Sequence, residues 1–574
     1  MSSLSTLLRS RWMFCSIAVV LAGVFVVGGC PPVNNNPDPN NVDPNSSNTD
    51  PNTTDPNTGG GIDDPNSGAN NGGGGGGGGT VVDPNTTNTT APTKLGFERL
   101  VQTGEQVPDQ PSGVTFSELG TPVIDSKGRV AFWALYTGSG KKGNGGLYVW
   151  EAGHISCVVD DDPGQVGIVP GRTTNDYFGP FTASNDPAIF DLEMAWGAGD
   201  RLLFVSPIAG EKSTVGIYRW RATDGNIVRV AEREQVAATF PDTPGAPDYN
   251  TFAPTFSIPG VSDNGIAIFG VSYLYLVSGD NPIKTGQGVF KSNGTTVSVI
   301  ADTRHSTLTP GDVPGQDPAA NAYFTSIDVL TTLNGAGDRL FTGAYTGGEG
   351  ARGIYLSRGD TNYRVIDTRS DPNWPGLTNT RITAPIRGFA IGPNGHIAVS
   401  SQVYDSDGGH RGVILWNWGT SSWTQLKGEN NAFATALLTG VNDDGECVIL
   451  ADSVPYLVSA STRTNIADAL PSGLKSAGLT WPEVGGAIND AGRAVLPYTR
   501  SDSSPGLAFY SGSGVFIAAD AALNTPQSGI TAITTVTGVQ RDRPSRSGMF
   551  NDADELVFLI DLASGQEIWV ARGE

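Results

Sequence analysis

The sequence predicts an all-β chain folded as a β-propeller of eight four-stranded blades. Three observations support this fold class. A nine-residue unit recurs eight times, strand patterns follow each copy, and the last copy ends one strand short. The mean spacing of about 61 residues is typical of propeller blades, so residues 95–574 can form a single body of eight repeats.

The repeated unit is clearest at Ile488–Leu496, which contains Asn489 and Gly492. Its seven relatives are Ile124–Phe132, Trp196–Phe204, Val261–Phe269, Leu333–Phe341, Ile391–Val399, Val441–Ile449 and Phe550–Phe558. The Asn side chain can accept a hydrogen bond from the backbone two residues on, and the Gly can adopt positive φ without a Cβ clash. Together they predict a tight hairpin, a type I turn with a G1 bulge. The predicted turn residues are Gly128, Gly265, Asn334, Gly337, Asn442, Gly445, Asn489, Gly492 and Asn551.

The last copy has Asp554 where most others have Gly, and Asp is one of the few residues that tolerate positive φ. A different interpretation makes Asn442–Gly445, which reads Asn-Asp-Asp-Gly, a calcium loop. That segment lacks the spaced acidic series and the distal Glu of an EF-hand loop. We therefore predict structural turns, and neither a metal nor a cofactor.

Three further strand patterns are recognisable in each repeat. The segment after the turn is apolar almost throughout, as in Val130–Leu135, which predicts a strand buried on both faces. A third strand starts at a Gly followed by aromatic or aliphatic residues, as in Gly146–Trp150 and Gly353–Leu356. A fourth closes the unit, as in Ile155–Val159.

The two ends of the repeat region predict closure into a ring. The last repeat supplies its third strand at Glu567–Ala571, and the sequence then ends one strand short. The first segment of the repeat region, Phe97–Gly104, resembles the fourth strands of other repeats, such as Val297–Ala301. Because a ring must join its first and last blades, we predict that this N-terminal strand completes the last blade.

Residues 1–29 are typical of a lipoprotein signal peptide. Arg9 and Arg11 precede an apolar run that is short for a membrane span. The run ends in Val-Gly-Gly-Cys, which resembles a bacterial lipobox, so Cys30 is the predicted site of lipid attachment and the membrane is a predicted partner. An ordinary secretory peptide and an uncleaved anchor are the alternatives.

Residues 30–94 predict a disordered tether. They contain six Asp-Pro-Asn triplets and the octaglycine Gly72–Gly79. Such a segment cannot bury enough apolar surface to offset the entropy of ordering it, and it would extend on the order of tens of ångströms. Pro31 and Pro32 leave no Asp at the second mature position, a pattern that resembles lipoproteins exported to the outer membrane. We expect a lipid anchor in the cell envelope, at the outer membrane or cell surface rather than the inner membrane.

Charge and cysteine usage narrow the possible partners. The formal charge of -22 repels phosphate backbones, so we predict no nucleic-acid partner. Four cysteines exclude a disulfide framework, and Cys157 and Cys447 lie in distant repeats. We expect these two to be small buried hydrophobes rather than a bridge, and the protein to be a monomer.

The repeat unit resembles the NxxGxxAF tandem repeat of bacterial envelope proteins that carry interchangeable surface anchors. Ile488–Leu496 and Leu333–Phe341 fit that pattern best, and the resemblance covers nearly all of residues 95–574. It implies a surface-attached β-repeat protein of unestablished activity. It transfers no catalytic residue, because none is assigned to the repeat.

Residues that do not repeat are the candidates for a site. Asp160–Asp162 is a run of carboxylates, and Asp405–His410 lies between two strand patterns; either could take a cation, but solvated turns are the more common explanation. The four histidines form no triad or metal spacing. We therefore expect a non-enzymatic envelope protein that binds a protein or glycan. The alternatives are a hydrolase or lyase acting on a polysaccharide through acidic residues at the propeller channel, and a packing component of the cell surface.

Overall fold

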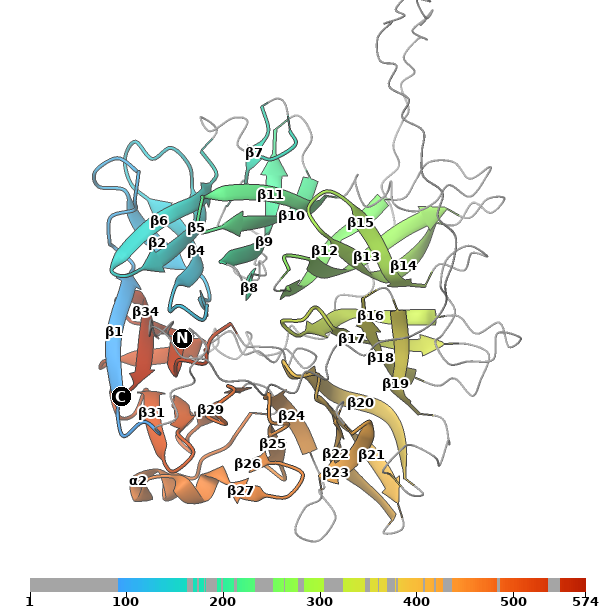
Figure 1. The fold of residues 1–574 in the computed structure, drawn as a ribbon. Helices are drawn as coiled ribbons and strands as arrows, with labels where there is room; N and C mark the ends of the chain where they lie inside the picture. Colours follow the sequence, from blue (N-terminus) through green and yellow to red (C-terminus); the bar gives the residue numbers. More distant parts are fainter. Residues whose placement is uncertain are drawn as a thin grey trace, which may run out of the picture. The chain divides into compact units, whose positions relative to one another are not determined.

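The computed structural model describes residues 91–574 apart from several gaps, the longest of which are 163–168, 182–193, 233–250, 277–282, 304–323, 346–351, 369–376, 427–435 and 535–547. The predicted signal peptide, Cys30 and most of the tether lie outside the described residues. The described chain forms eight antiparallel sheets that succeed one another as the blades of a ring (Figure 1). The predicted eight-bladed propeller is thus confirmed. Among the described residues, no helix combines the length and hydropathy needed to cross a bilayer.

The first two blades each have a first strand in two pieces. Blade 1 contains β2 (Thr115–Leu119), β3 (Val123–Ile124), β4 (Val130–Thr137), β5 (Gly145–Glu151) and β6 (His154–Asp160). Blade 2 contains β7 (Tyr177–Phe178), β8 (Met194–Gly197), β9 (Arg201–Ala209), β10 (Thr214–Arg221) and β11 (Asn226–Glu232). In blade 1 the interruption falls at Gly120–Pro122, where Pro122 has no amide hydrogen to donate to a ladder.

The next four blades follow the predicted order of four strands each. Blade 3 contains β12 (Thr251–Val261), β13 (Ala267–Leu276), β14 (Ile283–Ser292) and β15 (Val297–Asp302). Blade 4 contains β16 (Phe324–Leu333), β17 (Arg339–Tyr345), β18 (Arg352–Arg358) and β19 (Thr361–Asp367). Blade 5 contains β20 (Arg381–Ile391), β21 (Ile397–Asp405), β22 (Gly408–Asn417) and β23 (Ser422–Leu426). Blade 6 contains β24 (Ala436–Val441), β25 (Cys447–Ala451), β26 (Val454–Val458) and β27 (Arg463–Asn465).

The last two blades complete the ring. Two short helices, η3 (Ile466–Ala469) and α2 (Ser472–Lys475), lead from blade 6 to blade 7. Blade 7 contains β28 (Ala487–Ile488), β29 (Ala494–Thr499), β30 (Pro505–Tyr510) and β31 (Val515–Asp520). Blade 8 contains β32 (Ile530–Thr534), β33 (Glu555–Leu562), β34 (Gly565–Gly573) and, from the other end of the repeat region, β1 (Leu95–Gln102).

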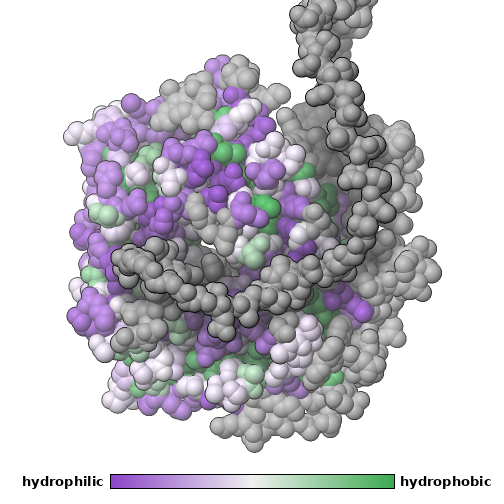
Figure 2. Space-filling model, viewed as in Figure 1, coloured by the Kyte–Doolittle hydropathy of each residue, from purple (hydrophilic) through white to green (hydrophobic). Residues whose placement is uncertain are grey.

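The hydrophobic core lies between neighbouring blades. Second strands such as β4 are buried on both faces, which matches their continuous apolar sequence. One cluster joins Leu203 and Ile217 of blade 2 to Phe269 of blade 3. Cys157 is partly buried and Cys447 is buried, and both are free thiols. Figure 2 shows that the surface over blades 1 and 2 is mainly hydrophilic on the face in view.

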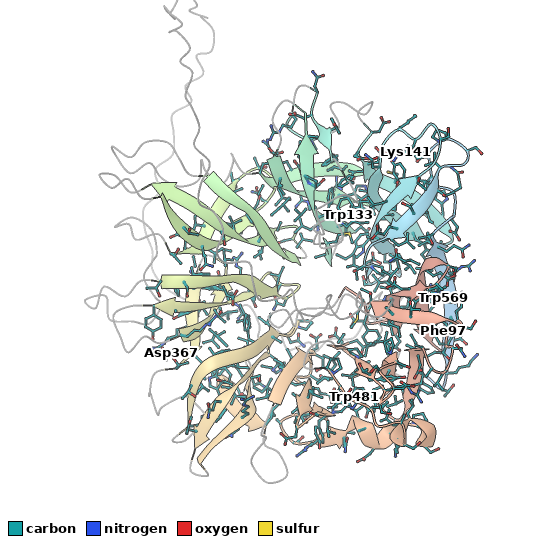
Figure 3. The ribbon with its side chains drawn as sticks, turned by 180° about the vertical axis from the view of Figure 1, so that it is seen from behind. Phe97, Trp133, Lys141, Asp367, Trp481 and Trp569 are labelled. Carbon is teal, nitrogen blue, oxygen red and sulfur yellow. The ribbon has the colours of Figure 1, made fainter. Side chains whose placement is uncertain are left out.

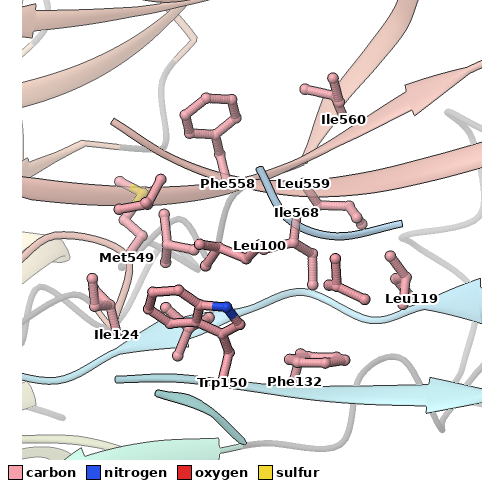
Figure 4. Packing of buried hydrophobic residues seen from close by; sticks show 14 of the residues in the cluster. Leu100, Leu119, Ile124, Phe132, Trp150, Met549, Phe558, Leu559, Ile560 and Ile568 are labelled. Atoms are coloured by element: carbon pink, nitrogen blue, oxygen red, sulfur yellow. The ribbon is translucent and has the colours of Figure 1, made fainter. Parts of the chain in front are cut away.

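The N-terminal strand β1 closes the ring as predicted. It pairs antiparallel with β34, with Leu95 opposite Gly573 and Gln102 opposite Glu567. Between the first and last blades, a continuous cluster packs Leu100, Phe132, Phe558, Ile568 and other residues together (Figure 4). Closure therefore buries apolar side chains from both ends of the repeat region, a contribution of about 25 cal/mol for each Å² removed from water.

Candidate functional site

The predicted turn residues lie in the hairpins between the first and second strands. Within one turn, Asn489 Oδ1 accepts hydrogen bonds from the backbone nitrogens of Ala491 and Arg493 at 3.2 and 3.0 Å. Asn334, Asn442 and Asn551 accept equivalent bonds in their own turns. The turn glycines all have positive φ, at 79° for Gly128, 83° for Gly265, 89° for Gly337, 75° for Gly445 and 71° for Gly492.

Several turns also bond to the turn of the following blade. Asn489 Nδ2 donates to the carbonyl oxygen of Asn551 at 3.4 Å, and Asn551 Nδ2 donates to that of Asp125 at 2.8 Å. Asn334 Nδ2 likewise donates to the carbonyl oxygen of Pro393 in the next blade. The Asn side chains therefore have a second role, holding blades together, and their polar groups are occupied by structural bonds.

Two turns replace the Gly with Asp, and there the contact between blades is ionic. Asp200 and Asp554 both have φ of 63°. Arg129 of blade 1 ion-pairs with Asp200 of blade 2, and Arg493 of blade 7 ion-pairs with Asp554 of blade 8. Each arginine directly follows the turn of its own blade, so the ionic contacts occupy equivalent places in the ring.

The carboxylate run Asp160–Asp162 lies at the end of β6 and is committed to local hydrogen bonds. Asp161 accepts from the backbone nitrogens of Asn144, Gly145 and Phe181 at 2.5 to 3.0 Å. Asp160 accepts from the backbone nitrogen of Asp162 at 3.1 Å and weakly from Gln110. Burial raises the pKa of Asp160, the charges of Asp162 and Asp161 add to the rise, and the bond from Asp162 opposes it.

The second acidic candidate lies at the hairpin that joins β21 and β22. Asp405 pairs with Gly408, and His410 pairs with Val403 in the ladder. His154 begins β6, His396 lies just before β21, and His305 falls outside the described residues. Within the described part of the chain, no three His, Cys, Asp or Glu side chains are placed to hold a metal ion.

A set of buried carboxylates at the ends of fourth strands was not anticipated. Asp520 accepts hydrogen bonds from the Tyr498 hydroxyl at 2.5 Å and from Arg500 at 2.7 Å. Asp367 is held in the same way by Tyr345 and Arg364, and Glu232 by Tyr218 and Arg172. Burial and then the Asp520 bond raise the pKa of Tyr498, so the phenol stays protonated and donates. The sequence did contain a signal for these carboxylates, because an acidic residue ends the fourth strand in several repeats.

The strongest candidate for ligand contact is a surface that we call the blade-8 patch: Phe97, Arg99, Gln527, Glu567 and Trp569. Phe97 and Arg99 project from one face of β1, and Arg99 lies directly opposite Trp569 on β34. Phe97 is 39% exposed, which is unusual for a large apolar side chain. Figure 3 shows Phe97 and Trp569 next to each other at the outer edge of blade 8.

Polar contacts hold this patch in place. The Trp569 indole nitrogen donates to Glu567 Oε2 at 2.8 Å, which fixes the orientation of the ring. Gln527 Nε2 and Arg99 Nη1 approach Glu567 Oε1 at 3.2 and 3.5 Å. The arrangement combines two aromatic surfaces, a carboxylate and a guanidinium, and its central carboxylate is already ordered.

The blade-8 patch was not predicted from the sequence. Its signal is the alternation Phe97-x-Arg99 and Glu567-x-Trp569, because residues two apart on a strand share a face. The sequence predicted that these two strands belong to the same blade. The register of β1 on β34 decides which of their residues lie opposite one another. A shift by one residue would place Phe97 and Trp569 on opposite faces of the sheet.

One family model matches part of the chain. Residues 209–427 match the model of a family of unknown function, DUF7453. A search of the curated proteins finds no match to the sequence.

Several solved structures resemble the fold at low identity. The β-propeller domain of the Trilobed protease from Pyrococcus furiosus is 8% identical, covering 71% of this chain and 98% of its own, with a TM-score of 0.33. Polysaccharide lyase Uly1 is 10% identical, covering 70% and 92%, with a TM-score of 0.31. The fucose-specific lectin of Aleuria aurantia is 12% identical, covering 57% and 95%, with a TM-score of 0.25. At these values the likeness says nothing about ligands.

Proposed function

We propose that this protein is a lipid-anchored, non-enzymatic binding protein of the bacterial cell envelope, and that its ligand is a saccharide bound at the blade-8 patch. The observation that carries the ligand class is the exposed Phe97 beside a Trp569 whose indole is fixed by Glu567. Flat aromatic faces can stack on the C–H faces of a sugar ring. The exposed Arg99 adds a donor for hydroxyl groups.

A preorganised site favours binding because less side-chain freedom is lost when the ligand arrives. The Trp569 ring is held by its hydrogen bond to Glu567, and the strand that carries it pairs with β33 on one side and β1 on the other. A saccharide would therefore meet a surface that is already in its bound arrangement.

The anchoring part of the proposal rests on the lipobox-like sequence before Cys30 and on the tether composition. One contact of the described residues is compatible with a single point of attachment. Thr93 donates a backbone hydrogen bond to the carbonyl oxygen of Glu574 at 2.7 Å, so the folded body begins beside its own C-terminus. A monomer tethered at this one point would have the remaining surface free for a ligand.

The hydrolase or lyase alternative has one observation in its favour, the raised pKa of buried Asp160. A general acid needs a carboxyl whose pKa is raised above its ordinary value. Against it, the other buried strand-end carboxylates Glu232, Asp367 and Asp520 are each held by an arginine and a tyrosine. The binding function is therefore the better supported.

The proposal is tested by screening the full-length protein against immobilised envelope and plant polysaccharides, with the soluble products measured in parallel. We expect saturable binding to at least one polysaccharide and no release of shortened or unsaturated products. Polysaccharide turnover that disappears in the Asp160→Asn variant would overturn the binding function in favour of the enzyme. Replacing Cys30 with Ser should remove lipid labelling in cells, and persistent labelling would contradict the anchor.

A further inference from the structure

Arg219 differs from four other buried or largely buried arginines of the described chain. Arg129, Arg172, Arg493 and Arg500 each form an ion pair with at least one buried or largely buried carboxylate. Arg219 is half-buried between blades 2 and 3, and its guanidinium donates a hydrogen bond to the carbonyl oxygen of Gly265. Among the residues that the structure describes, no carboxylate pairs with it.

Two more arginines share its face of the sheet. Arg201 on β9 pairs with Arg221 on β10, and Arg219 lies two residues before Arg221 on the same strand. A Cβ built on Gly265 would lie 3.1 Å from Cζ of Arg201 and 3.3 Å from Nη1 of Arg219. The guanidinium groups of Arg201 and Arg219 therefore lie side by side over one glycine of the blade-3 turn.

Gly294, in the turn between β14 and β15, brings a second stretch of blade 3 to the same place. A Cβ on Gly294 would lie 3.4 Å from Nη2 of Arg219. In both turns the backbone of a glycine therefore lies close to the Arg219 guanidinium.

An unpaired guanidinium in such a place is unfavourable without a counter-ion. Burial costs a charged group its hydration, and like charges nearby raise the cost further. Both effects lower the pKa of Arg219, burial being the larger and Arg201 and Arg221 adding to it. The chain has 57 acidic and 35 basic residues, so a half-buried cation with no acidic partner among the described residues is an exception that calls for a ligand.

We propose that Arg219, beside Arg201, binds an oxyanion between blades 2 and 3. The planar guanidinium fork matches two oxygens of a carboxylate, sulfate or phosphate group, and such charge-assisted pairs are about twice as strong as neutral hydrogen bonds. This site lies on a different blade from the blade-8 patch and does not depend on it. Its ligand is either a free inorganic anion or the acidic group of a saccharide.

The two sources are distinguished by titrating the full-length protein calorimetrically with inorganic sulfate and, separately, with glucuronate. We expect saturable binding of at least one probe at one site per chain, weakened at least tenfold in Arg219→Gln. The matched control is Arg352→Gln, a partly exposed arginine of blade 4 that pairs with Asp328. Binding of sulfate alone assigns the site to an inorganic anion, and tighter binding of glucuronate assigns it to an acidic sugar.

A melting experiment separates binding from a structural role. In a chloride buffer without oxyanions, Arg219→Gln should melt no lower than the wild type, because it removes an uncompensated charge. The bound probe should raise the melting temperature of the wild type and of Arg352→Gln but not of Arg219→Gln. If Arg219→Gln does not fold, Arg219→Lys replaces it, and it should weaken binding because it keeps the charge but loses the planar fork. No saturable binding of either probe, or binding unchanged by these variants, would overturn the proposal.

Discussion

The guanidinium of Arg129 in blade 1 lies 2.6 Å from the carboxylate of Asp200 in blade 2. Asp200 has positive φ at the turn position where most other repeats have Gly. Asp554 has positive φ at the same position of its own turn, and it forms an ion pair with Arg493. Two of the eight turns therefore replace a glycine with an ion pair to the preceding blade. The turns set the local backbone and also fix how neighbouring blades meet.

A double-mutant cycle on Arg129 and Asp200 tests this pairing. Replacing Asp200 with Gly keeps the turn conformation, because Gly also adopts positive φ. It should lower the free energy of unfolding by about 2 kcal/mol. The loss is limited because Arg129 still pairs with Asp125. Combining Asp200→Gly with Arg129→Gln should cost less than the sum of the two single changes. Urea unfolding measures all four proteins. Additive costs would show that the ion pair contributes nothing. The control is Asp224→Ala, which removes an exposed ion pair with Arg221 and should change the free energy of unfolding little.

Removing β1 should open the ring. Deleting residues 95–104 exposes the edge of β34 and one side of the cluster that contains Leu100 and Ile568, so we expect aggregation or a large loss of stability. Thermal melting and light scattering measure both effects. Deleting residues 31–80, within the predicted tether, is the matched control and should leave the melting temperature unchanged. If the deletion of residues 95–104 melted like the wild type, closure would be irrelevant to stability.

Asp160 should make stability depend on pH in a particular direction. Its pKa is raised in the folded state by burial, so the folded protein binds the proton more tightly than the unfolded chain does. The resulting stabilisation is fully present below the unfolded pKa and is lost as the pH rises through the folded pKa. Asp160→Asn should therefore stabilise the protein at neutral pH and have little effect in acid. Equal effects at both pH values would mean that Asp160 does not titrate in this way.

The second residue of β30 in blade 7, Gly506, should not accept a side chain. A Cβ on Gly506 would overlap the ring of Tyr498, whose hydroxyl is bonded to Asp520. Gly506→Ala should destabilise the protein by roughly 1–3 kcal/mol through overpacking and disturbance of that bond. Gly514→Ala is the control, because a Cβ there meets nothing within 4 Å. Denaturant unfolding that finds equal stability for the two variants would contradict the packing.

The parts of the fold that depend on repeated local chemistry could be predicted from the sequence. Positive φ at a turn is a property of Gly or Asp itself, so Gly492 and Asp554 were identifiable as turn residues. The resemblance of Phe97–Gly104 to other fourth strands was enough to predict ring closure, which β1 confirms.

The candidate sites depend on register and on contacts between blades, which no single repeat contains. Arg99 lies opposite Trp569 although 469 positions separate them, and nothing local fixes that pairing. Arg219 can be recognised as exceptional only when the carboxylates that pair with Arg129, Arg172 and Arg500 are known. In both cases the exceptional feature is a relationship between strands, and a sequence read repeat by repeat does not contain it.

The most direct test of the proposed function compares two exposed aromatic residues on outer strands. Phe97 belongs to the blade-8 patch, whereas Tyr363 on β19 is 44% exposed and lies opposite Leu356. Titration of the full-length protein with the best-bound saccharide should show binding weakened by about tenfold, or roughly 1.4 kcal/mol, in Phe97→Ala, and unchanged in Tyr363→Ala. Equal affinity of Phe97→Ala and the wild type, with both folded, would contradict saccharide binding at the blade-8 patch.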